Sequence, residues 1–249
     1  MHALHRLLIL FTLLALSFTA CRKRSHTELG LSLVQAVRDG SAGEVRDLIQ
    51  QGASLNARDE NGEILWRVAL EHYKKSVWDV LTENNIDLSQ VDSSGSLAIH
   101  VAAANGLADA AERILKMSAG KVQVSQQGDT PLIAASRYGM ANTVKAITPF
   151  FQDANERNKA GDTALIESAR SGNIKAVELI LKYKPMIPLA NFFGQTALSQ
   201  AQYYYFQDIV RLLQGFGAEN PEASKELLAA VKVKDLAKAQ SAVNRGANV

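Results

Sequence analysis

The sequence is short of cysteine, net charge and aromatic residues. Its single cysteine, Cys21, excludes an internal disulfide. A net charge of +2 over 249 residues leaves no domain-wide basic surface for nucleic acid. Phe, Trp and Tyr make up only 6% of the residues, so a local cluster of them is a feature to explain. The 47% of hydrophobic residues, in contrast, is enough for a continuous apolar core.

Residues with catalytic or metal-ligating spacing are also lacking. Three of the five histidines stand at or before residue 26, and His72 and His100 remain for a folded domain. No group of His, Cys and Asp residues has the spacing of metal ligands, and no nucleophile elbow is present. We therefore predict a non-enzymatic chain with no catalytic residues, no metal and no cofactor.

The one long apolar run stands at the N-terminus. Arg6 precedes the run from Leu7 to Leu16, and a small-residue stretch follows it, which is the order of a secretory signal. The run is shorter than the ~20 residues that a membrane-spanning helix needs. We predict a signal peptide over residues 1–20 and a short tether over residues 21–28.

The end of this leader, Phe18-Thr19-Ala20-Cys21, resembles the lipobox of bacterial lipoproteins, although that family prefers Leu where Phe18 stands. The resemblance implies that Cys21 is lipidated and holds the mature chain at a membrane in the periplasm. Arg22-Lys23-Arg24 argues against export, because positive charge after an apolar run tends to stay on the cytoplasmic side. Export without a lipid and a cytoplasm-facing anchor therefore remain as alternatives.

Glycines recur at a constant spacing through the rest of the chain. Five of them are 33 residues apart, and a second series has the same spacing. The first series is Gly62, Gly95, Gly128, Gly161 and Gly194, and the second is Gly106, Gly139 and Gly172. A fixed period of this length predicts a solenoid of stacked structural repeats.

The residues around these glycines resemble the ankyrin repeat. Gly128-Asp129-Thr130-Pro131-Leu132 begins one unit, and Thr163 and Thr196 keep the threonine in the next two. The resemblance implies an all-α fold, a solenoid of helix-turn-helix units with β-turn fingers, over residues 29–249. We predict an N-terminal cap over 29–58, full repeats over 59–91, 92–124, 125–157, 158–190 and 191–221, and a C-terminal cap over 222–249.

Each repeated position has an expected structural role. The threonines are expected to cap the inner helices, and the small residues Ala102, Ala135 and Ala201 let neighbouring inner helices approach closely. Leu132, Leu165, Leu198, Val177 and Ile180 are expected in the core, with Trp66 and Trp78. Tyr73 and Tyr205 replace the glycine between the helices, which predicts altered turns, and Tyr205 is a candidate for inward packing.

The resemblance also implies where a partner binds, on the finger tips and the exposed ends of the inner helices. At these positions the C-terminal repeats carry Tyr138, Phe192, Phe193, Tyr203 and Tyr204, beside Arg137 and Arg170. Aromatic residues and Arg dominate interface hot spots, so we predict that these residues contact a protein partner. The first repeat carries Glu60, Glu63 and Glu71 instead, which favours a secondary or steering role.

The sequence thus predicts a protein-binding module in the bacterial envelope. Its expected partners are folded proteins, with membrane contact only through the N-terminal lipid or anchor and no nucleic acid. The most specific hypothesis is inhibition or regulation of a periplasmic enzyme, such as a peptidoglycan-cleaving peptidase, in an immunity or self-protection role. A scaffold for another envelope enzyme and a secreted, host-directed ankyrin protein are the alternatives.

Overall fold

The computed structural model describes residues 25–218, 226, 229–231, 233–244 and 247. The predicted signal peptide, Cys21 and much of the predicted C-terminal cap lie outside these residues. The described residues form fourteen helices and no strand, apart from isolated bridges such as the one between Ala190 and Thr196. The all-helical repeat fold expected from the sequence is confirmed. The chain divides into two compact units, residues 1–86 and 87–249.

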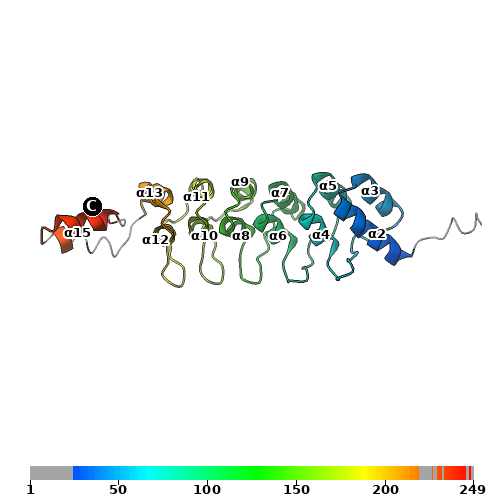
Figure 1. Cartoon of the computed structure of the whole chain (residues 1–249), viewed down its shortest axis with the longest axis horizontal. Helices are drawn as coiled ribbons and strands as arrows, with labels where there is room; N and C mark the ends of the chain where they lie inside the picture. Colours follow the sequence, from blue (N-terminus) through cyan, green and yellow to red (C-terminus); the bar gives the residue numbers. More distant parts are fainter. Residues whose placement is uncertain (1–24, 219–225, 227–228, 232, 245–246, 248–249) are drawn as a thin grey trace, which may run out of the picture. The chain divides into compact units, whose positions relative to one another are not determined.

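The first unit contains two helix pairs (Figure 1). The first pair is α2 (His26–Asp39) and α3 (Ala42–Gln50), and the second is α4 (Leu65–Glu71) and α5 (Lys75–Glu83). Within this unit α2 packs against α4, and α3 packs against α5. A capping box between Ser25 and Glu28 begins α2, and Gly40 in the left-handed conformation ends it.

The second unit repeats one motif of finger, inner helix and outer helix. Its inner helices are α6 (Ala98–Ala104), α8 (Pro131–Arg137), α10 (Ala164–Ser171) and α12 (Ala197–Tyr203). Its outer helices are α7 (Ala108–Met117), α9 (Ala141–Ile147), α11 (Ile174–Leu181) and α13 (Gln207–Gly215), with a 3-10 turn, η1 (Thr148–Phe150), after α9. Each inner helix packs against the next inner helix, and α7, α9, α11 and α13 pack in the same order. A further helix, α15 (Leu236–Asn244), lies in the predicted C-terminal cap.

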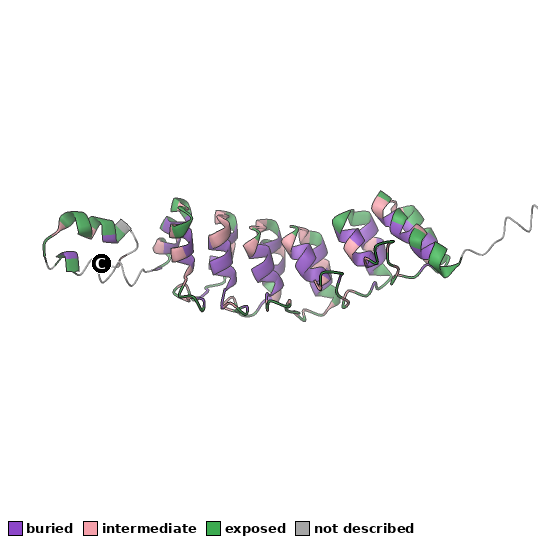
Figure 2. Ribbon diagram, turned by 60° about the horizontal axis from the view of Figure 1, so that its bottom comes forward, coloured by how far each residue is buried: buried purple, intermediate pink, exposed green. Residues whose placement is uncertain are grey.

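The expected caps and core residues are present. The hydroxyls of Thr130, Thr163 and Thr196 accept hydrogen bonds from the backbone at the third helical position of α8, α10 and α12. Buried residues line the faces on which helices of one unit pack (Figure 2). Every residue that the sequence placed in the core is at most 2% exposed, including Leu165 and Trp66, and the three spacing alanines are fully buried.

The two tyrosines at the glycine position behave differently. Tyr73 is not among the described residues with a positive φ, so the turn of the first repeat is altered as predicted. Tyr205 has a φ of 62°, close to the 76° of Gly172 one repeat earlier. The altered turn predicted at Tyr205 is therefore wrong. Its inward packing is wrong as well, because the residue is 81% exposed. The backbone of Tyr205 keeps the left-handed conformation of the regular turn, which is unfavourable for an L-residue. Its side chain points toward solvent.

Candidate functional site

Two fingers of the second unit are fixed by asparagine side chains. Asn158 Oδ1 accepts hydrogen bonds from the backbone of Ala160 and Asp162, each 2.9 Å long. Asn191 does the same one repeat later, with bonds to Phe193 and Gln195. Both asparagines also donate from Nδ2 to an aspartate of the preceding finger, Asp129 and Asp162 respectively. Each of these two fingers is thus closed by its own asparagine and joined to the finger before it.

Backbone contacts join the same fingers more closely. Lys159 N donates to Gln127 O, and Phe192 N donates to Ala160 O, both at 3.0 Å. A Cβ on Gly161 would come within 2.8 Å of Phe192 N, so only glycine allows this approach. The backbone of Phe192 is therefore held by the preceding finger, and the backbone of Phe193 is held by the Asn191 side chain.

A ladder of charged side chains runs behind the fingers. We use the name ionic ladder for five residues: Asp129, Arg137, Asp162, Glu167 and Arg170. Arg137 bonds to Asp129 of its own finger and, at 2.8 Å, to Glu167 of the next inner helix. Arg170 bonds to the same Glu167 at 2.9 Å and to Asp162 at 3.1 Å. Glu167 is only 1% exposed, and it joins two consecutive repeats through both arginines.

The contacts within the ladder shift the pKa values of Asp129 and of the two arginines. Burial acts to raise the pKa of Asp129, but hydrogen bonds from Arg137 and Asn158 outweigh burial and hold it below its ordinary value. For Arg137 the opposite balance applies: burial acts to lower its pKa, and the bonds to Asp129 and Glu167 raise it above the ordinary value. Asp129 and Arg137 thus remain charged at neutral pH.

The structure gives Arg137 and Arg170 internal partners that the sequence did not reveal. Their side chains remain 33% and 27% exposed, so one edge of each faces solvent. Their first contribution is to hold the fingers against the inner helices. Contact of these two arginines with a partner stays a prediction.

Five aromatic side chains lie exposed beside this framework. We use the name aromatic patch for Tyr138, Phe192, Phe193, Tyr203 and Tyr204. Their exposed fractions are, in the same order, 58%, 69%, 75%, 72% and 45%. The rings of Tyr203 and Tyr204 meet edge to face with centroids 5.0 Å apart. The guanidinium of Arg157 lies 6.0 Å from the centroid of Phe192. The rings point away from the core, as expected, and their role in binding stays a prediction.

A family model matches the repeated part of the chain. The model, described as ankyrin repeats in three copies, matches residues 68–149, 99–191 and 132–223, which together span more than half of the chain. The chain belongs to the ankyrin-repeat family. Ankyrin repeats are in general non-catalytic modules of protein–protein interaction, so binding is the function that the fold indicates. No curated protein sequence matches the chain.

The side chain of His100 links two consecutive repeats. Its Nε2 lies 2.7 Å from the carbonyl oxygen of Asp129, in the finger of the following repeat. Within the described ranges, no three His, Cys, Asp or Glu residues are grouped so that they could hold a metal ion. In the same part of the chain, every helix is too short or too polar to cross a membrane.

The ankyrin positions used to predict contacts omitted Tyr205. The residue stands next to Tyr204, and its 81% exposure is higher than that of any member of the aromatic patch. Its place between two helices is typical of a structural residue, and therefore no binding role was predicted for it. The one signal in the sequence was the tyrosine at a position where three other repeats have glycine.

Proposed function

We propose that this chain is a non-enzymatic binding module whose aromatic patch is the main contact surface for a folded protein. The observation that carries the proposal is the exposure of five large rings, between 45% and 75%, on fingers and inner-helix ends. Exposed clusters of large apolar side chains mark interaction sites, and tyrosine is enriched in hot spots.

The framework behind the patch supports a tight interaction. The fingers are held by asparagine bonds and by the ionic ladder, and Tyr204 stacks on Phe206 with centroids 6.0 Å apart. Side chains that are ordered before binding lose less conformational entropy when they meet a partner. Rings with few rotatable bonds add contact area at the same low entropic cost.

The test is a comparison of matched tyrosine variants. The wild-type chain captures its partner from an envelope extract, and the affinity for that partner is then measured with purified proteins. Tyr203→Ala combined with Tyr204→Ala is expected to weaken binding by about 30-fold or more, or ~2 kcal/mol, with unfolding close to wild type. Tyr183→Ala is the control, because Tyr183 is also 45% exposed but follows an outer helix.

A third variant compares the two ends of the repeat array. Glu60→Ala combined with Glu63→Ala is expected to reduce the affinity less than the tyrosine pair does, because charges outside the core of an interface contribute mainly to steering. If the tyrosine pair binds normally, or loses binding only because it unfolds, the partner docks elsewhere.

The proposal places the module in the bacterial envelope, held by a lipid on Cys21. The order of charged, apolar and small residues in the leader supports this location. Cys21→Ser is expected to release the chain from the membrane or to leave the leader attached. Mass spectrometry of the chain from cells measures this directly, and an intact, unlipidated N-terminus contradicts the proposal.

The partner that we propose is a periplasmic enzyme, with a peptidoglycan-cleaving peptidase as the most specific candidate. The combination of an export signal with a protein-binding patch supports this class of partner. Blocking its active site would protect the cell that makes the module. Activity assays on the captured enzyme separate the roles: inhibition supports protection, and unchanged activity favours a scaffold.

A further inference from the structure

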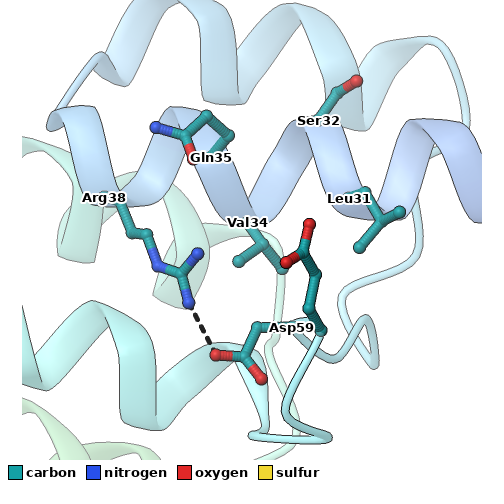
Figure 3. Close-up of a pocket in the computed structure, with 7 residues that line it drawn as sticks. Leu31, Ser32, Val34, Gln35, Arg38 and Asp59 are labelled. Carbon is teal, nitrogen blue, oxygen red and sulfur yellow. Dashed lines mark hydrogen bonds and ion pairs between the residues drawn. The ribbon is translucent and has the colours of Figure 1, made fainter.

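A pocket of about 280 Å³ opens in the first unit, between α2 and the finger that follows it (Figure 3). Five residues of α2 line it, and Asp59 and Glu60 of the finger complete the lining. The α2 residues are Leu31, Ser32, Val34, Gln35 and Arg38. None of them belongs to the aromatic patch or the ionic ladder.

The pocket exists because α2 has no finger of its own. Arg38 stands three periods of 33 residues before Arg137, and Gly30 stands three periods before Asp129. In the later repeat Asp129 lies in a finger and bonds to Arg137. In α2 the same position is helical, because the helix begins at His26. Among the described residues, therefore, no finger covers this side of α2.

Two of the charges in the pocket neutralise each other. Arg38 Nη2 donates to Asp59 Oδ2 at 2.6 Å, and the Asp59 side chain is only 6% exposed (Figure 3). The other oxygen of Asp59 accepts bonds from the backbone of Asn61 and Glu63. Asp59 therefore closes its finger and balances Arg38, and it has little capacity left for a ligand.

Glu60 supplies the charge that remains. It is exposed, and its carboxylate makes no hydrogen bond or ion pair with any residue that the structure describes. Gln35 donates from Nε2 to Asp39, which leaves its amide oxygen as an acceptor. The hydroxyl of Ser32 is a further acceptor in the lining. The unpaired polar groups of the pocket thus favour a donor that carries positive charge.

The apolar part of the lining suits a long side chain. Leu31 is 42% exposed, and Val34, which also lines the pocket, is 2% exposed. Lysine and arginine side chains lie with their methylene groups along apolar surface and keep the charged end among polar groups. The surrounding charge favours them as well, because residues 25–86 contain ten acidic and six basic side chains.

We infer that this pocket binds a lysine or arginine side chain of a partner protein. The methylene groups lie against Leu31 and Val34, and the charged end bonds to the Glu60 carboxylate and the Gln35 amide oxygen. The inference does not rest on the aromatic patch, because the two surfaces belong to different units.

The experiment uses short peptides in place of the unknown partner. Acetylated, amidated pentapeptides with a central Lys, Arg, Gln or Glu between alanines are titrated into the isotope-labelled protein. Amide chemical shifts of residues 31–38 and 59–63 report on the pocket. The Lys and Arg peptides are expected to shift these signals and to bind about three- to fivefold more tightly than the Gln peptide, the scale of one exposed ion pair.

Two variants distinguish binding in the pocket from a general effect of the acidic charge of the first unit. Glu60→Gln is expected to weaken binding of the Lys peptide to the level of the Gln peptide. Glu44→Gln removes another exposed charge, from α3 and outside the pocket, and is expected to leave binding unchanged. Both variants should unfold within about 1 kcal/mol of the wild type, because both side chains are exposed and Glu44 contributes only through the first turn of α3.

Three results would overturn the inference. Tighter binding of the Glu peptide would make Arg38 the recognising group and the pocket an anion site. Equal weakening by both variants would reduce the effect to overall charge. If a large excess of the Lys peptide changes no amide chemical shift at residues 31–38, the pocket does not bind a lysine side chain. None of these results bears on the aromatic patch, since the titration contains no partner protein.

Discussion

The buried carboxylate of Glu167 lies 2.8 Å from the guanidinium of Arg137, thirty residues earlier in the chain. The same carboxylate accepts a bond from Arg170, so one acidic group holds two repeats together. A buried carboxylate is costly to desolvate, and it is tolerated here because both oxygens are paired. The stability of the central repeats therefore depends on this one side chain more than on any exposed ion pair.

We predict that Glu167→Gln lowers the free energy of unfolding by about 3 kcal/mol. Stability is lost because the guanidinium groups of Arg137 and Arg170 stay partly buried without the negative charge of Glu167. The value lies at the low end for breaking a buried pair, because both arginines are about a third exposed and water can reach them. Urea unfolding measures the change.

Glu178→Gln is the matched control for this variant. Glu178 is an exposed residue of α11 in the same repeat, and its replacement is expected to change stability by less than ~0.5 kcal/mol. Equal effects of the two substitutions would show that the ladder adds nothing beyond ordinary surface charge.

His100 makes the stability depend on pH below about 6.5. Its Nε2 bonds to a carbonyl oxygen, so this nitrogen carries the proton, and its buried Nδ1 has no partner among the described residues. Burial holds the pKa of His100 below the ordinary 6.5, despite the opposing effect of Asp129. The folded state therefore resists a proton that the unfolded state accepts.

The expected result is a loss of stability as the pH falls below about 6.5, continuing down to the pKa of the folded state. Above pH 6.5 both states hold the ring neutral, and this contribution is constant. Urea unfolding at pH 7.5, 6.5 and 5.5 measures the slope. His100→Gln is expected to remove this part of the slope, and His72→Gln, at an exposed position, is expected to keep it.

The repeat register has its own test at Leu165. This residue is 2% exposed at the start of α10, where the sequence pattern placed a core leucine. Leu165→Ala is expected to lower the free energy of unfolding by about 2–5 kcal/mol, the range for a buried leucine. Met186→Ala, at a residue that is 59% exposed, serves as the comparison. A loss below ~0.5 kcal/mol at Leu165 would contradict the register.

The period of 33 residues was enough to predict the fold because each repeat has the same local chemistry. Thr130, Thr163 and Thr196 each cap the helix that follows them, which depends on neighbours within a few residues. Burial of Leu132 and Leu198 follows from the same register. These features are local, and a single sequence contains them.

The ionic ladder and the pocket were not predicted, because both depend on side chains from different repeats. Arg137 and Glu167 are ordinary surface residue types, and nothing local in the sequence shows that they meet. Periodicity could have suggested the pair, since the arginine recurs at Arg170. The pocket depends on α2 residues and on Asp59 and Glu60 of the next finger, and nothing local in the sequence shows that these residues meet.

Tyr205 connects backbone strain to the proposed function. Its φ of 62° is a conformation that costs an L-residue about 1–2 kcal/mol, and glycine occupies the equivalent place in three earlier repeats. Packing does not repay this cost, because the ring is 81% exposed. Strain of this kind gathers at functional sites, and Tyr205 stands beside Tyr204 of the aromatic patch. We therefore expect the ring to be retained because it contacts the partner.

Tyr205→Gly is predicted to change stability and binding in opposite directions. Relief of the strain exceeds the entropic cost of glycine, so unfolding becomes harder by about 0.5–1 kcal/mol. Loss of the ring weakens binding to the captured partner, by about tenfold if it contributes as an interface tyrosine. Lys184→Gly is the matched control, because Lys184 has a φ of 52° and follows the outer helix α11. It should gain stability without losing affinity. Destabilisation by Tyr205→Gly would mean that the ring packs in solution, and unchanged affinity would separate the strained turn from the binding surface.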